Sequence, residues 1–406
     1  MATANIQPRH EPAIIQQHMV QLDGLRAFAV FAVVLWHYSE GSFVHDLVQW
    51  GFLGVRLFFV LSGFLITRIL LDCRDKVDAY GFSTWYTVKN FYIRRFLRIF
   101  PIYYLFVLAM FLGLPIVREN IWWYLSYCQN IRFAMENKFL AGPHLWTLAV
   151  EEQFYLFWPF MILFLPRRQL PAWIILSVLA GPFTRWLLLS LGWSPFAAML
   201  MTPSNLDTLG MGALLAWMMK NKPGEPTEKF MKFSLWAGLP LLVLYIAMQN
   251  LGLERTTKEA PTSGESFLFV FGDVALSFLS TWLIYRGAVG FTGVTGRILS
   301  LSPITYIGKI SYGIYIYHHA VFVTLSEIVF PRLGIEIPNY VVLNLLVFGS
   351  VSVAISAASW HLFEKPLNDF KKYFPYAPRD ANAKAGQNAD PDNLDGKNRH
   401  QPSNAG

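Results

Sequence analysis

The sequence predicts an all-α, polytopic membrane protein, a bundle of about ten transmembrane helices with both the N and the C terminus in the cytoplasm. Three observations support this class. The chain of 406 residues is 54% hydrophobic and only 15% charged, and its mean hydropathy is +0.37, which is more apolar than an ordinary soluble domain. Long apolar stretches recur along the chain. Its basic residues concentrate between alternate stretches.

Ten apolar stretches are long enough to cross about 30 Å of hydrocarbon as helices. They lie near residues 20–38, 51–71, 99–116, 147–165, 171–192, 203–219, 234–251, 267–285, 304–329 and 339–361. With a cytoplasmic N terminus, the inner segments carry 22 Lys and Arg residues and the outer loops carry 6. This asymmetry follows the positive-inside rule. Membrane topology therefore accounts for the net charge of +7, and nucleic-acid binding is not indicated.

The sequence outside the spans is polar. Residues 1–19 lack the apolar core of a signal peptide and are expected to stay in the cytoplasm. Residues 20–366 form the predicted transmembrane domain, and residues 367–406 are expected to form a disordered cytoplasmic tail. Cys73 and Cys128 fall in predicted loops on opposite sides, so neither a disulfide nor a cysteine metal site is indicated.

The first span contains two polar residues that are costly in a membrane, Arg26 and His37. Eleven helical steps return to within roughly 20° of the starting face and advance about 16 Å, so both side chains lie on one stripe. Such a stripe faces the bundle interior or a wet cavity and is functional by default.

The second span, GFLGVRLFFVLSGFLIT, is interrupted by Gly54, Ser62 and Gly63. Small residues let membrane helices pack closely, so helix packing explains the glycines as well as a site does. For Arg56, near the start of this span, the alternative to a role in a site is an end residue that snorkels to the interface.

The inner loop that follows reads FYIRRFLRIF and places Arg94, Arg95 and Arg98 just inside the membrane. Guanidinium groups match phosphate geometry, so this cluster is suited to a phosphorylated ligand that enters from the cytoplasm. The alternatives are a positive-inside anchor and a contact with lipid headgroups.

The fourth span opens with HLWTLAVEEQFY and carries two adjacent carboxylates, Glu151 and Glu152. Neighbouring helical positions point about 100° apart, so the two carboxylates are expected to have different partners. Trp146 and His144 fit an aromatic belt at the outer interface as readily as they fit a site.

The ninth span contains Ser311, Tyr315 and His318 at helical spacing, and His319 follows directly. Adjacent histidines point in different directions, so at most one is expected to line a cavity. No second cluster of metal-ligating residues supports a metal site.

Several motifs together carry a family resemblance. They are the basic residue and His of Arg26 and His37, the GxxxFFxxSG pattern from Gly54 to Gly63, the RxxR element of Arg95 and Arg98, the signature from Trp146 to Tyr155 with Thr147 in place of Ser, the pattern from Ser311 to His318 with Tyr317 in place of Trp, and FEKP from Phe363 to Pro366. Over residues 20–366 the chain resembles the acyltransferase-3 family of integral membrane O-acyltransferases.

The resemblance implies an enzyme that moves an acyl group, usually acetyl, from cytoplasmic acyl-CoA to a sugar hydroxyl of a glycan, glycolipid or glycosylated small molecule. The expected location is the bacterial inner membrane, with membrane lipids around the protein and a separate envelope protein as a possible partner. Acyl-CoA is expected as the donor co-substrate, without a permanently bound cofactor and without a metal. The competing interpretation is a proton-coupled transporter or a glycolipid flippase.

Residue roles follow from the same resemblance and from side-chain chemistry. The expected catalytic residues are His37, Glu151 and Glu152. The residues expected to bind the donor are Arg26, Arg95 and Arg98. The residues expected to contact the substrate are Trp146, Ser62 and His318. His37 is expected either to take the proton of the acceptor hydroxyl or to carry the acyl group itself.

Overall fold

The computed structural model describes residues 19–250, 263–335, 338 and 340–378. Residues 1–18 of the expected N-terminal segment and residues 379–406 of the expected tail lie outside the described residues. The described part of the chain is helical and contains no strand. The all-α class is therefore confirmed.

Long helices form the body of the molecule. They are α1 (Val20–Tyr38), α3 (Trp50–Tyr80), α4 (Thr84–Gly113), α8 (Leu145–Phe164), α9 (Leu170–Ser190), α11 (Leu206–Asn221), α12 (Glu225–Asn250), α13 (Ser263–Val289), α16 (Ser311–Val323) and α19 (Ser350–Ser359).

Short elements connect or extend these helices. They are α2 (Phe43–Leu47), α5 (Pro115–Glu119), α6 (Ile121–Leu125), α7 (Gln129–Glu136), α10 (Pro195–Leu200), η2 (Thr202–Asn205), α14 (Gly293–Leu299), α15 (Ser302–Lys309), η3 (Thr324–Val329), α17 (Phe330–Arg332), α18 (Val341–Asn344), η4 (Leu345–Gly349), η5 (Trp360–Glu364), α20 (Lys365–Asp369) and η6 (Phe370–Tyr373).

Seven helical segments of the described residues are long and apolar enough to cross a membrane. Two of them are composite: Ser311–Arg332 joins α16 to α17, and Val341–Tyr373 joins α18 to η6. The other three predicted spans correspond to α8, α11 and α12, which are also helices. The chain is a multi-pass integral membrane protein.

Several helices differ in extent from the predicted spans. α3 continues to Tyr80 instead of ending near residue 71, and α4 begins at Thr84 instead of near residue 99. Hydropathy marks where a helix leaves the membrane, whereas Arg, Lys and Leu keep it helical beyond that point. Arg95 and Arg98 therefore lie within α4 and not in a loop.

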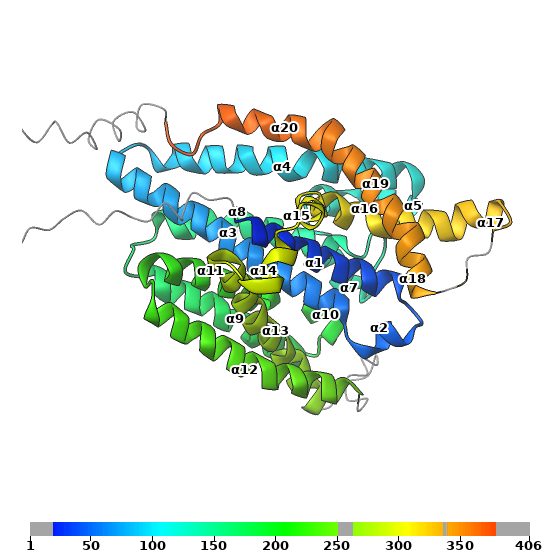
Figure 1. Ribbon diagram of the computed structural model, residues 1–406, viewed down its shortest axis with the longest axis horizontal. Helices are drawn as coiled ribbons and strands as arrows, with labels where there is room; N and C mark the ends of the chain where they lie inside the picture. The colour runs from blue at the N-terminus through cyan, green and yellow to red at the C-terminus, as the bar shows by residue number, and fades with distance from the viewer. Residues whose placement is uncertain (1–18, 251–262, 336–337, 339, 379–406) are drawn as a thin grey trace, which may run out of the picture.

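The predicted ninth span is divided at Ile310. α15 is seen almost end-on in Figure 1, whereas α16 runs across the view. Gly308 in α15 lies directly against the backbone of Asp23 in α1, where a larger residue would overlap the carbonyl group. The division places the N-terminus of α16 inside the bundle.

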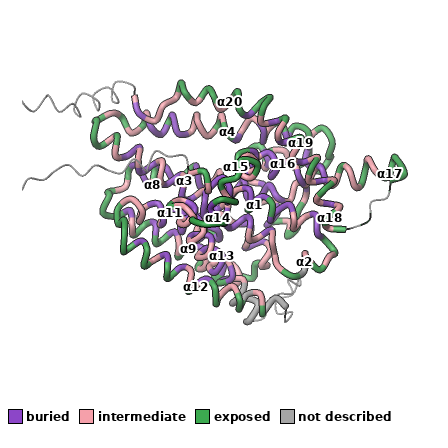
Figure 2. The backbone as a smooth tube through the Cα atoms, viewed as in Figure 1, coloured by how far each residue is buried: buried purple, intermediate pink, exposed green. Residues whose placement is uncertain are grey.

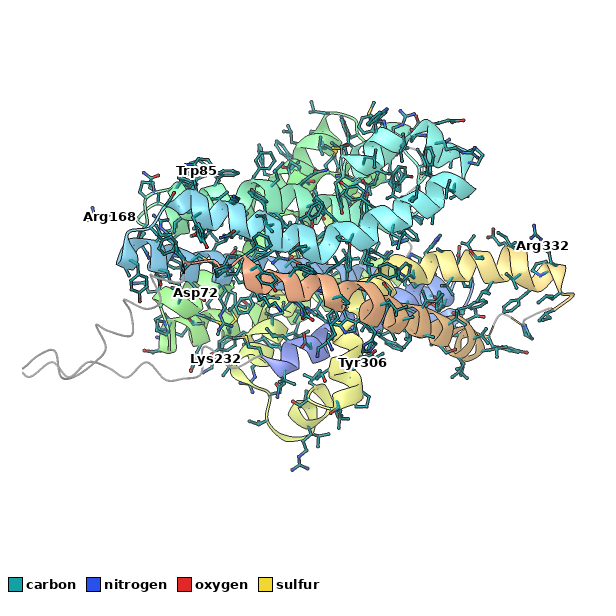
Figure 3. The ribbon with its side chains drawn as sticks, turned by 90° about the horizontal axis from the view of Figure 1, so that it is seen from above. Asp72, Trp85, Arg168, Lys232, Tyr306 and Arg332 are labelled. Atoms are coloured by element: carbon teal, nitrogen blue, oxygen red, sulfur yellow. The ribbon has the colours of Figure 1, made fainter. Side chains whose placement is uncertain are left out.

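Three of the predicted inner loops gather at one end of the bundle. Asp72, Trp85, Arg168 and Lys232 lie toward that end, and Arg332 lies at the opposite end (Figure 3). Ion pairs join the loops there, since Arg167 binds Asp75 at 2.8 Å and Asp78 at 2.6 Å, and Lys220 binds Asp72 and Asp75. The ion pairs thus join the loops near residues 72–78, 167 and 220, which the sequence assigns to the same side of the membrane.

Burial divides the helices into inner and outer ones. α1 and α3 lie at the centre and are the most buried of the candidate spans, whereas α9 and the Val341–Tyr373 segment are the least (Figure 2). The outer helices expose large apolar side chains such as Phe157, Leu179, Trp236 and Leu346. Such a surface suits a hydrocarbon environment.

Two glycines bring α3 and α11 into backbone contact. A side chain on Gly63 would overlap the carbonyl oxygen of Leu209, and one on Gly212 would overlap that of Val60. Small residues permit this close approach of membrane helices. The packing interpretation of Gly63 is thus correct, and the contact holds α3 in place beside the site.

The structure places residues 367–378 of the expected tail along α4. Arg94 donates to the carbonyl oxygens of Lys371 at 2.6 Å and Phe374 at 3.2 Å, and its guanidinium lies 4.6 Å from the ring of Tyr376. Aromatic residues in this segment supply the apolar surface that the more distal sequence lacks.

Candidate active site

A central cavity of about 280 Å³ lies among α1, α3, α4, α8 and the start of α16. Along α3 it extends from Val55 to Ile69, which corresponds to about 21 Å of helix. The cavity therefore follows much of the thickness of a bilayer. Its lining is largely apolar, with a few polar groups that converge from separate helices.

Three arginines face this cavity: Arg26 from α1, and Arg95 and Arg98 from α4. Arg98 is solvent-accessible although it lies inside the bundle, because it borders the cavity. Arg26 also binds Asp23 at 2.8 Å. The N-terminus of α16 contributes Ser311 and Tyr312 to the same wall. Guanidinium groups and a helix N-terminus both favour an anion.

Arg94 has a different environment from its two neighbours. It binds the C-terminal segment and is absent from the described residues that line the cavity. The arginine cluster of the sequence therefore separates into one structural anchor and two cavity residues.

The two carboxylates are also brought to the cavity. Ser62 on α3 donates a hydrogen bond of 2.5 Å to Glu151, and Glu152 lines the wall one residue further along α8. Tyr155 lies between them and α4, with the Arg95 guanidinium 4.9 Å from its ring. The expectation that Glu151 and Glu152 have different surroundings agrees with this arrangement, because Glu152 also borders a second cavity.

His37 lies beyond the end of the cavity, in a cluster of four histidines. Its ring is 4.9 Å from that of His318 and 5.6 Å from that of His319, and His144 is 5.0 Å from His318. Nε2 of His318 is 3.3 Å from Nδ1 of His37. The described residues include no His, Cys, Asp or Glu group arranged to hold a metal ion.

Sequence reasoning missed two members of this cluster. His144 is 4% exposed and is not at a lipid interface, and both His318 and His319 approach His37. His144 precedes α8 by one residue, so it meets α16 only once the helices are assembled. The sequence did contain a signal: His144 lies beside an apolar segment, as His37 and His318 do in two others.

Tyr315 and Thr147 form the boundary between the cavity and the histidines. Their hydroxyl groups are 2.5 Å apart, and Tyr315 also donates to the carbonyl oxygen of His144 at 3.0 Å. Both line the cavity, and the Tyr315 ring is 5.8 Å from that of His318. The hydroxyl-bonded pair of Tyr315 and Thr147 therefore lies between the cavity and the histidine cluster.

Trp146 is placed behind the cavity wall. It is 6% exposed, and its ring packs edge-to-face on Phe59 with centroids 6.1 Å apart. It is not among the described residues that line the cavity. The structure brings Arg26, Ser62, Arg95, Arg98, Glu151 and Glu152 together there, and places His37 and His318 next to it.

A side cavity of about 520 Å³ adjoins the central one between α4 and α8. The two cavities share Arg95, Glu152 and Tyr155. Its lining includes the half-exposed Phe96 and Leu156 and the buried Tyr127, whose hydroxyl group has no hydrogen-bond partner among the described residues.

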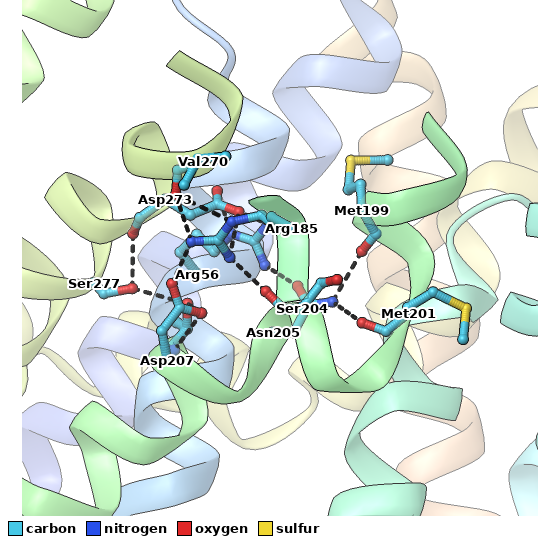
Figure 4. Close-up of polar contacts among 11 residues, drawn as sticks. Arg56, Arg185, Met199, Met201, Ser204, Asn205, Asp207, Val270, Asp273 and Ser277 are labelled. Carbon is cyan, nitrogen blue, oxygen red and sulfur yellow. Dashed lines mark hydrogen bonds and ion pairs between the residues drawn. The ribbon is translucent and has the colours of Figure 1, made fainter. Parts of the chain in front are cut away.

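A second group of charges within the bundle is drawn in Figure 4, and none of its members is among the residues that line the two cavities. Arg56 of α3 is 1% exposed and binds Asp273 of α13 with two hydrogen bonds of 2.8 and 2.6 Å. Arg185 of α9 binds Asp207 of α11 at 2.7 Å and lies 3.5 Å from Asp273. The interpretation of Arg56 as a snorkelling residue is wrong, because its partner comes from a helix 217 residues away.

The fold and the cavity define a multi-pass integral membrane protein whose helix bundle encloses a largely apolar cavity with a few charged side chains on its wall. The chain belongs to the acyltransferase 3 family, whose profile, described as an acyltransferase domain, matches residues 19–362. No solved structure matches the chain significantly.

Curated relatives are bacterial proteins. The chain is similar to the peptidoglycan O-acetyltransferase OatA of Listeria monocytogenes, with 27% identity over 413 residues, 88% of this chain and 57% of the relative. It is 28% identical over 404 residues to the O-acetyltransferase OatA of Staphylococcus aureus strain NCTC 8325, covering 91% of this chain and 61% of the relative. A candidate peptidoglycan O-acetyltransferase of Bacillus subtilis is 29% identical over 378 residues, covering 85% of this chain and 54% of the relative. The chain thus spans little more than half the length of these relatives.

Proposed function

We propose that the protein is a membrane O-acetyltransferase that takes an acetyl group from cytoplasmic acetyl-CoA and transfers it to a sugar hydroxyl of a cell-envelope glycan. The observation that carries this proposal is the convergence of Arg26, Arg95 and Arg98 with Glu151 on one elongated cavity. Membership of the acyltransferase 3 family and the similarity to peptidoglycan O-acetyltransferases support it.

The donor would lie along the cavity with its phosphates at Arg95 and Arg98 and its thioester toward Tyr315. Arg95 and Arg98, with the α16 N-terminus, bind the phosphates of the donor, since rigid guanidinium groups pair with phosphate oxygens. The slim, flexible arm of the donor then follows the cavity past Arg26. The thioester comes to rest near Tyr315, adjacent to the histidine cluster.

The reaction is a displacement at the thioester carbonyl. The oxygen of the sugar hydroxyl attacks the carbonyl carbon while His37 takes its proton, and the C–O bond forms as the C–S bond breaks. The departing thiolate recovers that proton from His37, which leaves the enzyme unchanged and releases the free thiol. Formation of an acyl-histidine at His37, followed by attack of the sugar hydroxyl, is the two-step version.

The position of Tyr315 sets a requirement for this chemistry. Because it separates the cavity from His37, the Tyr315 side chain must move aside when donor and acceptor meet. Glu151 and Glu152 line the same cavity as Tyr315. Their carboxylate oxygens can accept hydrogen bonds from the hydroxyl groups of a sugar.

The test is transfer of label in detergent. Purified protein is incubated with acetyl-CoA labelled in the acetyl group and with muropeptides as the acceptor, and the acceptor is analysed for an O-acetyl ester. Appearance of labelled ester supports the proposal, because detergent removes every gradient that a transporter needs. Binding or movement of glycan in vesicles without acetyl-CoA, together with no labelled ester, would favour a carrier instead.

A further inference from the structure

We propose that His318 is a positioning residue that, together with the carbonyl group of Val33, holds the hydrogen of His37 on Nδ1, so that Nε2 of His37 is the atom that accepts the proton. The catalytic part of this assignment rests on the proposed acetyl transfer. The tautomer itself follows from the hydrogen-bond geometry of the two rings.

The state of His318 is set by backbone carbonyl groups. Its Nδ1 is 2.8 Å from the carbonyl oxygen of Tyr315 and 3.2 Å from that of Ile314. A carbonyl oxygen can only accept a hydrogen bond, so Nδ1 must carry a hydrogen. In the neutral ring Nε2 then holds a lone pair, and that atom faces His37.

The state of His37 follows in turn. Its Nδ1 is 2.9 Å from the carbonyl oxygen of Val33 and 3.3 Å from Nε2 of His318. Both neighbours are acceptors, so Nδ1 of His37 is the donor of a shared hydrogen bond. The lone pair of neutral His37 is consequently on Nε2, which is available as a base.

The same pair suits the charged intermediate. When Nε2 of His37 takes a proton, the ring becomes a cation with hydrogens on both nitrogens, and its Nδ1–H still points at the lone pair of His318. A hydrogen bond from a charged donor is stronger than a neutral one. His318 thus stabilises the protonated base without itself exchanging a proton with the substrate.

The surrounding structure holds His318 rigidly. Its side chain is fully buried, and its own carbonyl oxygen accepts a hydrogen bond of 2.9 Å from Tyr38, whose hydroxyl is also 2.9 Å from Ser352. His319 has no such bond to His37 among the described contacts and touches it edge-on at 5.6 Å. This role differs from the substrate contact expected of His318 from its motif.

Kinetics separates positioning from substrate binding. We expect His318→Leu, which removes the acceptor, to lower kcat by about 100-fold with an unchanged KM for acetyl-CoA. His318→Gln keeps an acceptor oxygen near the position of Nε2 and should recover part of kcat. The matched control is His361→Leu, at an exposed histidine outside the cluster that lies 3.1 Å from the Tyr306 hydroxyl group, and it should leave kcat within about threefold of wild type. A raised KM with unchanged kcat in His318→Leu would overturn the proposal.

The tautomers are read directly by solid-state NMR of the full-length protein labelled with ¹⁵N-histidine in lipid, with the His37 signals assigned by their loss in His37→Gln. We expect His37 to be protonated on Nδ1 and unprotonated on Nε2 in wild type and in His318→Gln. In His318→Leu only the carbonyl oxygen of Val33 still accepts from Nδ1, so we expect the Nδ1 signal of His37 to be displaced. Protonation on Nε2 of His37 in wild type, or an unchanged Nδ1 signal of His37 in His318→Leu, would refute it. The spectrum requires no acetyl transfer, so it distinguishes failure of this inference from failure of the proposed function.

Discussion

Arg94, Arg95 and Arg98 occupy adjacent positions of α4 but have different surroundings. Arg94 is bound to the carbonyl groups of the C-terminal segment, whereas Arg95 and Arg98 border the cavity. Arg94 therefore holds the C-terminal segment, a role that neither alternative included, and phosphate binding stays a prediction for Arg95 and Arg98.

This division yields a kinetic prediction. We expect Arg95→Gln and Arg98→Gln each to raise the KM for acetyl-CoA by about tenfold or more, because a charged hydrogen bond contributes roughly 1.5–3 kcal/mol. Arg94→Gln is the matched control: it should lower the thermal stability in detergent and leave KM unchanged. An equal KM for all three variants and wild type would show that the phosphates bind elsewhere.

His37 carries the strongest prediction at this scale. His37→Ala should reduce acetyl transfer by about 100-fold or more, since it removes the base, while the folded protein keeps its gel-filtration profile. His45→Ala, at a histidine that stacks on Trp36 outside the cluster, is the control and should stay active. Activity above a few per cent of wild type in His37→Ala would exclude a catalytic role for this residue.

Individual residues were predictable to the extent that their neighbours lie in the same helix. The shared stripe of Arg26 and His37 followed from spacing along α1, but the Ser62–Glu151 bond and the His37–His318 pair join residues 89 and 281 positions apart. Periodicity contains no information on such pairs. The burial of Trp146 was missed for the same reason, because Phe59 covers it from another helix.

At the scale of helices, the buried charges of Arg56, Arg185, Asp207 and Asp273 join α3, α9, α11 and α13 (Figure 4). The two cations and two anions balance, so the group can be accommodated in an apolar environment. The position of this group away from both cavities indicates that it fixes helix packing.

Removing one member should therefore unfold the bundle more easily. We expect Arg56→Met to lower the free energy of unfolding in mixed micelles by about 3 kcal/mol, because it leaves the partly buried carboxylate of Asp273 without its main partner. The double variant Arg56→Met with Asp273→Leu restores the balance of charge and should recover part of that loss. Arg297→Met, at an exposed arginine of α14, should change stability by less than about 0.5 kcal/mol. Equal stability of Arg56→Met and wild type would contradict the role in packing.

Helix existence was well predicted, and helix ends were not. Each apolar stretch that hydropathy located is helical among the described residues, and seven helical segments are long and apolar enough to cross a membrane, which leaves the count of ten a prediction. The extensions of α3 to Tyr80 and of α4 back to Thr84 contain charged residues, which lower the hydropathy of these segments. The division at Ile310 lies next to the contact of Gly308 with α1. Both depend on tertiary structure, which a hydropathy window does not include.

For the whole molecule, orientation in the membrane remains a prediction. In a background with both native cysteines replaced by serine, we expect Arg332→Cys to react with a membrane-impermeant thiol reagent in intact cells. Arg168→Cys lies at the opposite end of the bundle (Figure 3) and should react only after permeabilisation. The reverse pattern would place the donor site on the outer face and would contradict the use of cytoplasmic acetyl-CoA.

The backbone contact between α3 and α11 also determines how the chamber can change shape. At Gly63 and Gly212 the backbones of the two helices are in direct contact. Close packing of this kind makes the α3 wall of the central cavity rigid. α4 borders the central cavity on one side and the side cavity on the other, and thus has space to yield in both directions. We expect admission of a donor wider than the resting chamber to occur by outward displacement of α4, with α3 acting as the fixed frame.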